Sequence, residues 1–381
     1  MRVVFASLPA YGHLYPLMPL AQAFAAVGHQ VVLAVGDPFH GRMPLPTVSA
    51  MPAERDLGWS FAETRRRHPG IAGQDMVVAM FAEIGAESTV DALVPEFEKV
   101  RPDLVVYEAL DVGAGVAADV LGISVAAFGI GMFEPAVPLV HMAAARAQAG
   151  RWADHGRPVR AETSLLAGAY LDPIAAGLHP GGVPSIPHRL PIRPQAWSES
   201  IGGVPGWLTA ARVRPRVYIT LGTVSYGAVE VLRRAVRETA TLGVDVLVTV
   251  GPHGDPSALG EVPDAVHVER FVPQSLVLPL VDVVVHHGGT GTMLGALEAG
   301  LPQLVLPQGA DQFHNGGVVA QAGAGRMLRN EEQLAGEIQA AVAALLADGP
   351  ECATARRLSQ EIAALPAPAV LVDALVQFAD G

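Results

Sequence analysis

The sequence predicts an α/β fold made of two consecutive domains, each a doubly wound parallel sheet. Short β-branched runs alternate with Ala- and Leu-rich segments of helical periodicity, which is typical of parallel strands joined by crossover helices. This alternation stops in a Pro- and Gly-rich stretch after residue 190 and begins again at residue 216. The chain of 381 residues is also long enough for two domains of ordinary size.

In the first half, the apolar runs are too short for buried helices, and the segments between them have helical spacing. The rhythm is lost over residues 139–190, where we assign no element. The expected strands are 2–8, 30–35, 103–107 and 124–128, and the expected helices include 17–27 and 112–121.

The second half repeats the pattern without a visible sequence repeat. The tail over 370–379 has the spacing of one more short amphipathic helix. The expected strands are 216–220, 244–250, 266–270, 281–285 and 303–306, and the expected helices are 228–241, 292–299 and 331–347. We therefore expect a first domain over 1–200, a linker over 201–215 and a second domain over 216–366, with a helix at about 367–381 that packs back on the first domain.

Composition excludes several classes of partner. The net charge is −12, and no run of Lys or Arg is longer than the three residues 65–67, so neither nucleic acid nor an anionic membrane is an expected partner. No segment approaches the roughly 20 apolar residues of a membrane span, and we expect no signal peptide. Cys352 is the only cysteine, which excludes disulfides and cysteine-built metal sites and fits a cytoplasmic location.

A histidine follows the first strand, at the point where open α/β sheets bind ligands. His13 lies in the turn between this strand and a helix, where the positive end of the helix favours a neutral imidazole that can act as a base. The simpler alternative is a turn histidine that only bonds to the backbone. A carboxylate at the end of a neighbouring strand would favour the catalytic interpretation by holding the other ring nitrogen. Glu108 is our first choice for that carboxylate and Asp111 the second, although Asp111 has the alternative of capping the next helix.

A glycine-rich loop follows the strand at 281–285. The segment "HHGGTGT" (286–292) enters a helix, and glycine amides at a helix N-terminus form a site for phosphate. His287, Thr290 and Thr292 add donors, and the loop "TLGT" offers a second group of amides at Gly222 and Thr223. The sequence therefore predicts a diphosphate site in the second domain.

Two rival interpretations of this loop fail in detail. The glycine spacing is GxGxxxG instead of the GxGxxG of dinucleotide-binding proteins. A zinc site is excluded because adjacent histidines in an extended segment point to opposite faces. No two aspartates are separated by a single residue, so the DxD motif that binds a metal and a diphosphate in many sugar transferases is absent. We expect no metal and no cofactor.

Together, the segments "GHLYPLMPLA", "RFVPQ", "HHGGTGTMLGALEAGLPQLVLP" and "ADQFHN" resemble the family 1 nucleotide-sugar glycosyltransferases. The most similar branch is the one that attaches deoxysugars to actinomycete enediynes, angucyclines, glycopeptides and macrolides. The resemblance spans nearly the whole chain. It implies the GT-B fold, in which two Rossmann-like domains face a central cleft whose closure excludes water.

The resemblance also implies roles for single residues. His13 would be the general base that removes the acceptor proton, with Glu108, where many relatives have Asp, as its partner; Asp111 stays an alternative. Phe271, Val272 and Gln274 would contact the nucleoside. The diphosphate would be bound by His287, Gly289, Thr290, Gly291 and Thr292, with Gly222 and Thr223 on the opposite side, and the donor sugar by Asp311 and Gln312.

On the same grounds we expect an inverting transfer from a dTDP-sugar, or less favourably a UDP-sugar, to a hydroxyl of a hydrophobic aglycone. N- or C-transfer stays open, as does a monomer or a homodimer. An apolar acceptor pocket would lie in the first domain, and we select Tyr11 and Phe133 for it from Tyr11, Trp59, Met76, Met80, Phe81, Met132, Phe133 and Met142. The alternatives are an inactive protein that binds the nucleotide sugar or aglycone, and a nucleotide-sugar epimerase of the same architecture.

Overall fold

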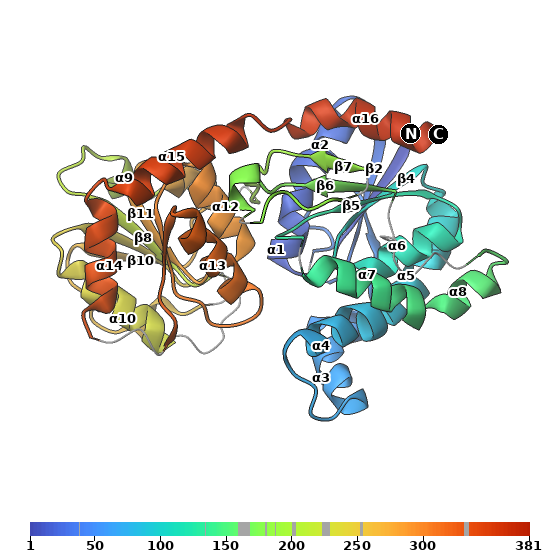
Figure 1. The fold of residues 1–381 in the computed structure, drawn as a ribbon, viewed down its shortest axis with the longest axis horizontal. Helices are drawn as coiled ribbons and strands as arrows, with labels where there is room; N and C mark the ends of the chain where they lie inside the picture. The colour runs from blue at the N-terminus through green and yellow to red at the C-terminus, as the bar shows by residue number, and fades with distance from the viewer. Residues whose placement is uncertain are drawn as a thin grey trace. The chain divides into compact units, whose positions relative to one another are not determined.

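The structure is a computed structural model, and the chain divides into two compact units (Figure 1). Unit 1 comprises Met1–Pro173, Pro184–Arg193 and Pro366–Gly381, and unit 2 comprises Ile174–Val183 and Pro194–Leu365. The chain thus enters unit 2 briefly at 174–183, before the predicted linker. The structure describes residues 1–37, 39–133, 135–158, 168–179, 181–186, 188–199, 203–222, 229–251, 254–330 and 335–381.

Unit 1 is built on a parallel sheet of order β3-β2-β1-β4-β5-β6-β7, with helices on both faces (Figure 1). The C-terminal helix α16 belongs to this unit and lies beside α2. Its strands are β1 (Arg2–Ala6), β2 (Gln30–Val35), β3 (Thr47–Ser49), β4 (Leu104–Glu108), β5 (Ser124–Phe128), β6 (Ala169–Asp172) and β7 (Arg189–Pro191). Its helices are α1 (Tyr11–Leu14), η1 (Tyr15–Leu17), α2 (Met18–Ala26), η2 (Ala53–Arg55), α3 (Leu57–Arg67), α4 (Gly73–Val78), the π-helix η3 (Ala79–Gly85), α5 (Ala86–Val100), α6 (Val112–Val120), α7 (Ala136–Ala147), α8 (Ala149–Asp154) and α16 (Pro368–Asp380).

Unit 2 has a second parallel sheet, of order β10-β9-β8-β11-β12-β13. Its strands are β8 (Arg216–Thr220), β9 (Asp245–Thr249), β10 (Val266–Glu269), β11 (Val283–His286), β12 (Gln303–Val305) and β13 (Gly325–Met327). Its helices are η4 (Ala176–Leu178), α9 (Gly206–Thr209), α10 (Val229–Ala240), η5 (Pro256–Leu259), α11 (Gln274–Val277), η6 (Leu278–Leu280), α12 (Thr290–Glu298), α13 (Gln312–Ala322), α14 (Glu337–Leu346) and α15 (Pro350–Ala363).

Both sheets are buried on their two faces, which explains the nearly continuous apolar strands. In β8, Val217 and Ile219 enter the core on one face, whereas Tyr218 enters the core on the other. This alternation follows from the two-residue period of a strand. Polar and charged side chains therefore gather in the loops at the ends of the strands.

The predicted fold class is confirmed, and every predicted strand is present with its ends shifted by at most a few residues. The strands that the sequence did not reveal are β3, β6, β7 and β13, which have three or four residues each and are too short to show a period. The region 139–190, to which no element was assigned, contains β6 and most of α7, whose Ala-rich sequence gives little contrast between its faces.

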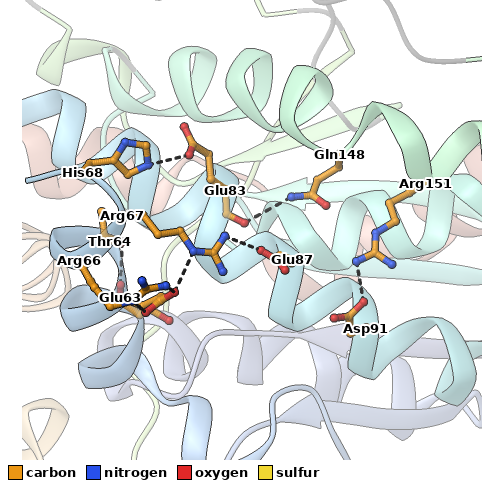
Figure 2. Close-up of polar contacts among 11 residues, drawn as sticks. Glu63, Thr64, Arg66, Arg67, His68, Glu83, Glu87, Asp91, Gln148 and Arg151 are labelled. Atoms are coloured by element: carbon orange, nitrogen blue, oxygen red, sulfur yellow. Dashed lines mark hydrogen bonds and ion pairs between the residues drawn. The ribbon is translucent and has the colours of Figure 1, made fainter.

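A group of helices between β3 and β4 is held together by polar contacts (Figure 2). Glu63 accepts from Arg66 and Arg67, and these guanidinium groups lower its pKa to about 2. On the neighbouring π-helix, the carboxylate of Glu83 contacts His68 Nε2 at 2.9 Å. The contact of Glu83 with His68 links the π-helix to the end of α3, and the π-helix also brings the Phe81 ring to 6.3 Å from the ring of the catalytic candidate His13.

Within the described residues, no single helix is long and apolar enough to cross a membrane. Among the described residues, α15 and α16 together have the length and apolar composition of a span that is broken between them.

The approach of α6 to α5 gives a test of packing in unit 1. A Cβ at Gly113 would lie 2.7 Å from Thr89 Cβ and 2.8 Å from the Ala86 carbonyl oxygen. The backbone of α5 would have to move to relieve the second of these clashes. We expect Gly113→Ala to lower the free energy of unfolding by about 1–3 kcal/mol. Thermal and urea unfolding followed by circular dichroism measure this effect.

The matched control is Gly150→Ala in α8, where a Cβ would meet no described atom within 4 Å. Because alanine favours a helix over glycine, this variant should be as stable as the wild type or up to about 1 kcal/mol more stable. Equal unfolding midpoints for the two variants would contradict the packing argument.

Candidate functional site

His13 lies at the carboxyl end of the unit 1 sheet, in the short helix α1 that follows β1. Its backbone N–H donates to the Ala10 carbonyl at 3.0 Å, which closes the turn between strand and helix. The side chain is 20% exposed, so the imidazole is accessible. This is the predicted placement of a base above the sheet edge.

The carboxylate that contacts His13 is Glu108, the last residue of β4. His13 Nδ1 and Glu108 Oε1 are 3.0 Å apart, and β4 is the direct neighbour of β1. Glu108 is fully buried, and its Oε2 accepts from the Leu110 amide at 3.3 Å. An ionised carboxylate only accepts hydrogen bonds, so Nδ1 of His13 carries a proton and donates it.

Asp111 takes a different place in the same turn. Its side chain is buried and makes no capping bond to α6, and its Oδ2 has no partner in hydrogen-bonding geometry among the described residues. Burial, and then the negative charge of Glu108, raise the pKa of Asp111 to about 8. The raised pKa of Asp111 and the 3.0 Å contact of Glu108 with His13 both favour Glu108 as the partner of His13.

The candidate acceptor residues do not share one environment. Tyr11 is partly exposed and packs edge-on against Tyr15 and Phe39, whereas Phe133 is only 6% exposed and packs against Tyr170 in the core. The Phe81 ring of this group lies near the base, with 6.3 Å between its centroid and that of His13. Phe81 lies on the π-helix, a rare element that often occurs at functional sites.

In unit 2, the His287 ring lies between two glycines. A Cβ at Gly222 would lie 2.5 Å from Cε1 of His287, and a Cβ at Gly289 would lie 2.4 Å from its Nε2. Only glycine leaves room for the imidazole at either position. Gly222 also has φ +81°, and its amide donates to Thr220 Oγ1 at 3.3 Å, so it acts here as a close-packing residue.

Burial lowers the pKa of His287 to about 4, although the negative charge of Asp311 opposes this shift. The imidazole is therefore neutral at physiological pH and acts by hydrogen bonding. Within the described part of the chain, His287 Nδ1 has no partner in hydrogen-bonding geometry, although the Thr220 backbone lies near enough to influence the pKa.

Helix α12 begins at the end of this loop with unpaired amides. Its N-cap, Gly289, has no side chain to cap the first turn, and no acidic residue follows in that turn. Thr290, Gly291 and Thr292 thus present a helix N-terminus suited to an anion. The Thr292 hydroxyl oxygen accepts from Gln274 Nε2 at 3.0 Å, which links the predicted nucleoside residue to the predicted diphosphate loop.

His286 has a structural place beneath the loop. Its Nδ1 accepts from the Gly288 amide at 3.1 Å, so Nε2 carries the proton and donates to Gln303 Oε1 at 2.7 Å. Burial lowers the pKa of His286 to about 3. His286, as a neutral Nε2–H tautomer, thus connects the Gly288 amide of the loop to the side chain of Gln303.

The Asp311 side chain does not cap α13; instead its Oδ2 accepts from Thr290 Oγ1 at 3.2 Å. Gln312 is buried, and its Oε1 accepts from the backbone amides of Gln308 and Gly309. Asn315 joins these parts, because its Nδ2 lies within 3.0 Å of Gly288 O, Thr290 Oγ1 and Asp311 Oδ2.

The remaining predicted residues are Phe271, Val272 and Thr223. Phe271 is 37% exposed, which leaves its ring available for stacking, whereas Val272 is buried. Thr223 lies outside the described residues. No three His, Cys, Asp or Glu side chains gather as a possible metal site in the ranges that the structure describes.

The sequence did not reveal Asn315 or His141 as parts of the site, and it placed Phe81 among the acceptor-pocket candidates without selecting it. Asn315 was visible within "ADQFHN" but had no assigned contact. His141 lies in α7, and its Nε2 contacts the Ala109 carbonyl oxygen beside Glu108 at 2.8 Å. A lone histidine in an Ala-rich helix gives no pattern that would reveal such a contact.

Comparison with known proteins agrees with the fold and identifies the family. Residues 233–378 match the C-terminal domain of the erythromycin biosynthesis protein CIII-like family. The chain is 32% identical to the L-demethylnoviosyl transferase of Streptomyces niveus, over 98% of this chain and 97% of that protein. It is 30% identical to the tylactone mycaminosyltransferase of Streptomyces fradiae, over 98% and 92% of the two chains.

Among solved structures, the spinosyn rhamnosyltransferase SpnG complexed with thymidine diphosphate is similar, with a TM-score of 0.81 and 28% identity. The match covers 99% of this chain and 100% of SpnG, which is also known complexed with spinosyn aglycone. Fold and sequence identity agree over the whole length. The chain therefore belongs to the actinomycete antibiotic glycosyltransferases, which have the GT-B fold.

Proposed function

We propose that the protein transfers a deoxysugar from a dTDP-sugar to a hydroxyl group of a hydrophobic secondary-metabolite aglycone, with inversion and without a metal ion. The observation that carries this proposal is the 3.0 Å contact between His13 Nδ1 and the buried Glu108 carboxylate. A histidine held in this way is suited to remove a proton from an acceptor hydroxyl. UDP-sugars are the less favoured donors.

The base acts through its second ring nitrogen. With Nδ1–H donated to Glu108, the lone pair of neutral His13 is on Nε2, which takes the hydroxyl proton as the oxygen attacks. The buried negative charge of Glu108 stabilises the imidazolium that forms. Glu108 thus orients the imidazole and does not itself take up the acceptor proton.

The leaving group is stabilised in unit 2. The new bond joins the acceptor oxygen to the anomeric carbon, and the bond from that carbon to the diphosphate oxygen breaks on the opposite face, so one displacement inverts the configuration. Negative charge grows on the diphosphate, where the α12 N-terminus and His287 supply donors that are already in place. Transfer therefore needs both units.

Several findings support the substrates. The SpnG structures contain thymidine diphosphate or an aglycone, and the two relatives are named for transfer to natural products. We extend these ligand classes to this chain because the similarity covers nearly its whole length. The absent DxD motif supports transfer without a metal, and the single Cys352, which is buried and free, is consistent with the cytoplasmic location that we include in the proposal.

A matrix of nucleotide sugars and aglycones, analysed by mass spectrometry with and without EDTA, tests this proposal. We expect an aglycone product heavier by one deoxysugar, with unchanged yield in EDTA and inverted anomeric configuration by NMR. Conversion of the donor without an acceptor would instead show an epimerase. Binding of donor or aglycone with no turnover in any pair would show an auxiliary protein.

His13→Ala should lower kcat/KM by about 10²–10⁴-fold, because the general base is lost. Donor KM should change little, since the donor residues belong to unit 2. The matched control is His29→Ala, because His29 Nδ1 contacts the Met1 amino group at 3.2 Å at the opposite end of β1. Steady-state kinetics measure both variants, and wild-type rates for His13→Ala would contradict the assignment of the base.

Donor KM should be nearly constant between pH 5.5 and 8, because His287 is neutral above pH of about 4 and so changes no charge in this range. His287→Leu should raise donor KM by about 10- to 100-fold, since a hydrogen bond to a charged group contributes roughly 1.5–3 kcal/mol. His287→Gln, which keeps an N–H donor, should raise it less. A tenfold rise in wild-type donor KM between pH 5.5 and 7.5 would show that His287 acts as a cation instead.

A further inference from the structure

The residue after Glu108, Ala109, has a buried backbone carbonyl that accepts a hydrogen bond from a side chain. Ala109 is fully buried, and its amide donates to Phe128 O at 2.8 Å as the last bond between β4 and β5. Its carbonyl oxygen accepts from His141 Nε2 at 2.8 Å. Loss of this donor would leave the buried carbonyl without that hydrogen bond and would lower the free energy of unfolding.

His141 is built to be a neutral donor. The side chain is fully buried in α7, and this burial lowers its pKa to about 4, so the imidazole carries no charge at physiological pH. Its ring lies along the Tyr107 ring, with centroids 6.1 Å apart and planes at 28°. Tyr107 is packed against Gly115, where a Cβ would lie only 2.7 Å from the Tyr107 ring.

The geometry of one peptide links this donor to Glu108. The Ala109 carbonyl and the Leu110 amide belong to the same planar peptide group, in which C=O and N–H point in opposite directions. His141 bonds the carbonyl, whereas the Leu110 N–H donates to Glu108 Oε2 at 3.3 Å. Fixing one end of this peptide plane therefore fixes the direction of the other.

We infer that His141 is a positioning residue: by holding the Ala109–Leu110 peptide plane it sets the orientation of the Glu108 carboxylate, and through it the tautomer of His13. The effect on catalysis rests on the function proposed above. The effect on the His13 tautomer depends only on the contacts of unit 1. Without His141, the peptide can rotate, the Leu110 amide turns away, and Glu108 keeps a single contact with His13.

Two variants of His141 separate positioning from packing. His141→Leu keeps an apolar side chain of similar bulk but removes the donor, whereas His141→Gln retains an N–H of similar reach. The control Thr64→Val removes another buried bond from a side chain to the backbone, from Thr64 Oγ1 to Ser60 O at 2.7 Å in α3. Any general effect of losing one buried hydrogen bond appears in this control.

The first measurement is the ¹⁵N spectrum of labelled histidine, with His13 assigned from the His13→Ala variant. In the wild type and in Thr64→Val we expect His13 as a single Nδ1–H tautomer, and in His141→Leu a mixture of tautomers. His141→Gln should restore the single tautomer. The wild-type spectrum must also show His141 as a neutral Nε2–H tautomer with a slowly exchanging proton, and its absence overturns the inference even if His141→Leu fails to fold.

The second measurement is steady-state kinetics with an active donor and acceptor pair. His141→Leu should lower kcat about tenfold with donor KM unchanged, as expected when a catalytic group is slightly misplaced, and His141→Gln should recover most of that loss. A folded His141→Leu with a single His13 tautomer and kcat within about twofold of the wild type overturns the inference while the transferase function stands. Tautomer changes in a protein without any transfer would support the positioning contact and refute the proposed function.

Discussion

Each sheet of this protein is parallel and covered by helices on both faces, and this burial constrains where polar groups can lie. Inside the sheets, backbone groups are paired along the strands and side chains are apolar, so charged and polar side chains gather where strands end. His13 and Glu108 come from two neighbouring strand ends in unit 1. The loop that contains His287 follows β11, which pairs with β8 at the centre of the unit 2 sheet. Both candidate half-sites are consequences of the same architecture.

Burial also decides the charge state of the histidines near these strand ends. It lowers the pKa values of His141, His286 and His287 to between about 3 and 4, so these three imidazoles act as neutral donors and acceptors. His286 supports the loop from below with a defined tautomer, and His287 lies in the loop between two glycines. Under the proposed function, an anionic donor would meet backbone amides, hydroxyl groups and neutral rings. This explains how a protein of net charge −12 is suited to a diphosphate without a cluster of Lys and Arg.

The polar side chains around the second half-site form a connected set. Asn315 lies at its centre and joins the carbonyl of Gly288 to the side chains of Thr290 and Asp311. These residues come from the loop after β11, from α12 and from the start of α13, so Asn315 connects three segments of unit 2. Asp311 and Gln312 were expected at the donor sugar. In this structure Asp311 Oδ2 receives bonds from Thr290 and Asn315, and Gln312 Oε1 receives bonds from the Gln308 and Gly309 amides. Their role toward a sugar remains a prediction from the family resemblance.

The sequence by itself determined the two-domain α/β fold, the longer strands and the family, because strand and helix periods and the order of the loop motifs are local properties of the chain. It also indicated His13 and the glycine-rich loop, since both directly follow a recognisable strand. It left open whether Glu108 or Asp111 lies against His13. Only the tertiary structure decided this, because His13 and Glu108 are 95 positions apart in the sequence. Their contact depends on the order of strands in the sheet. The same holds for His141 and Asn315, which act through backbone and side-chain groups that are distant in sequence or hidden within a helix.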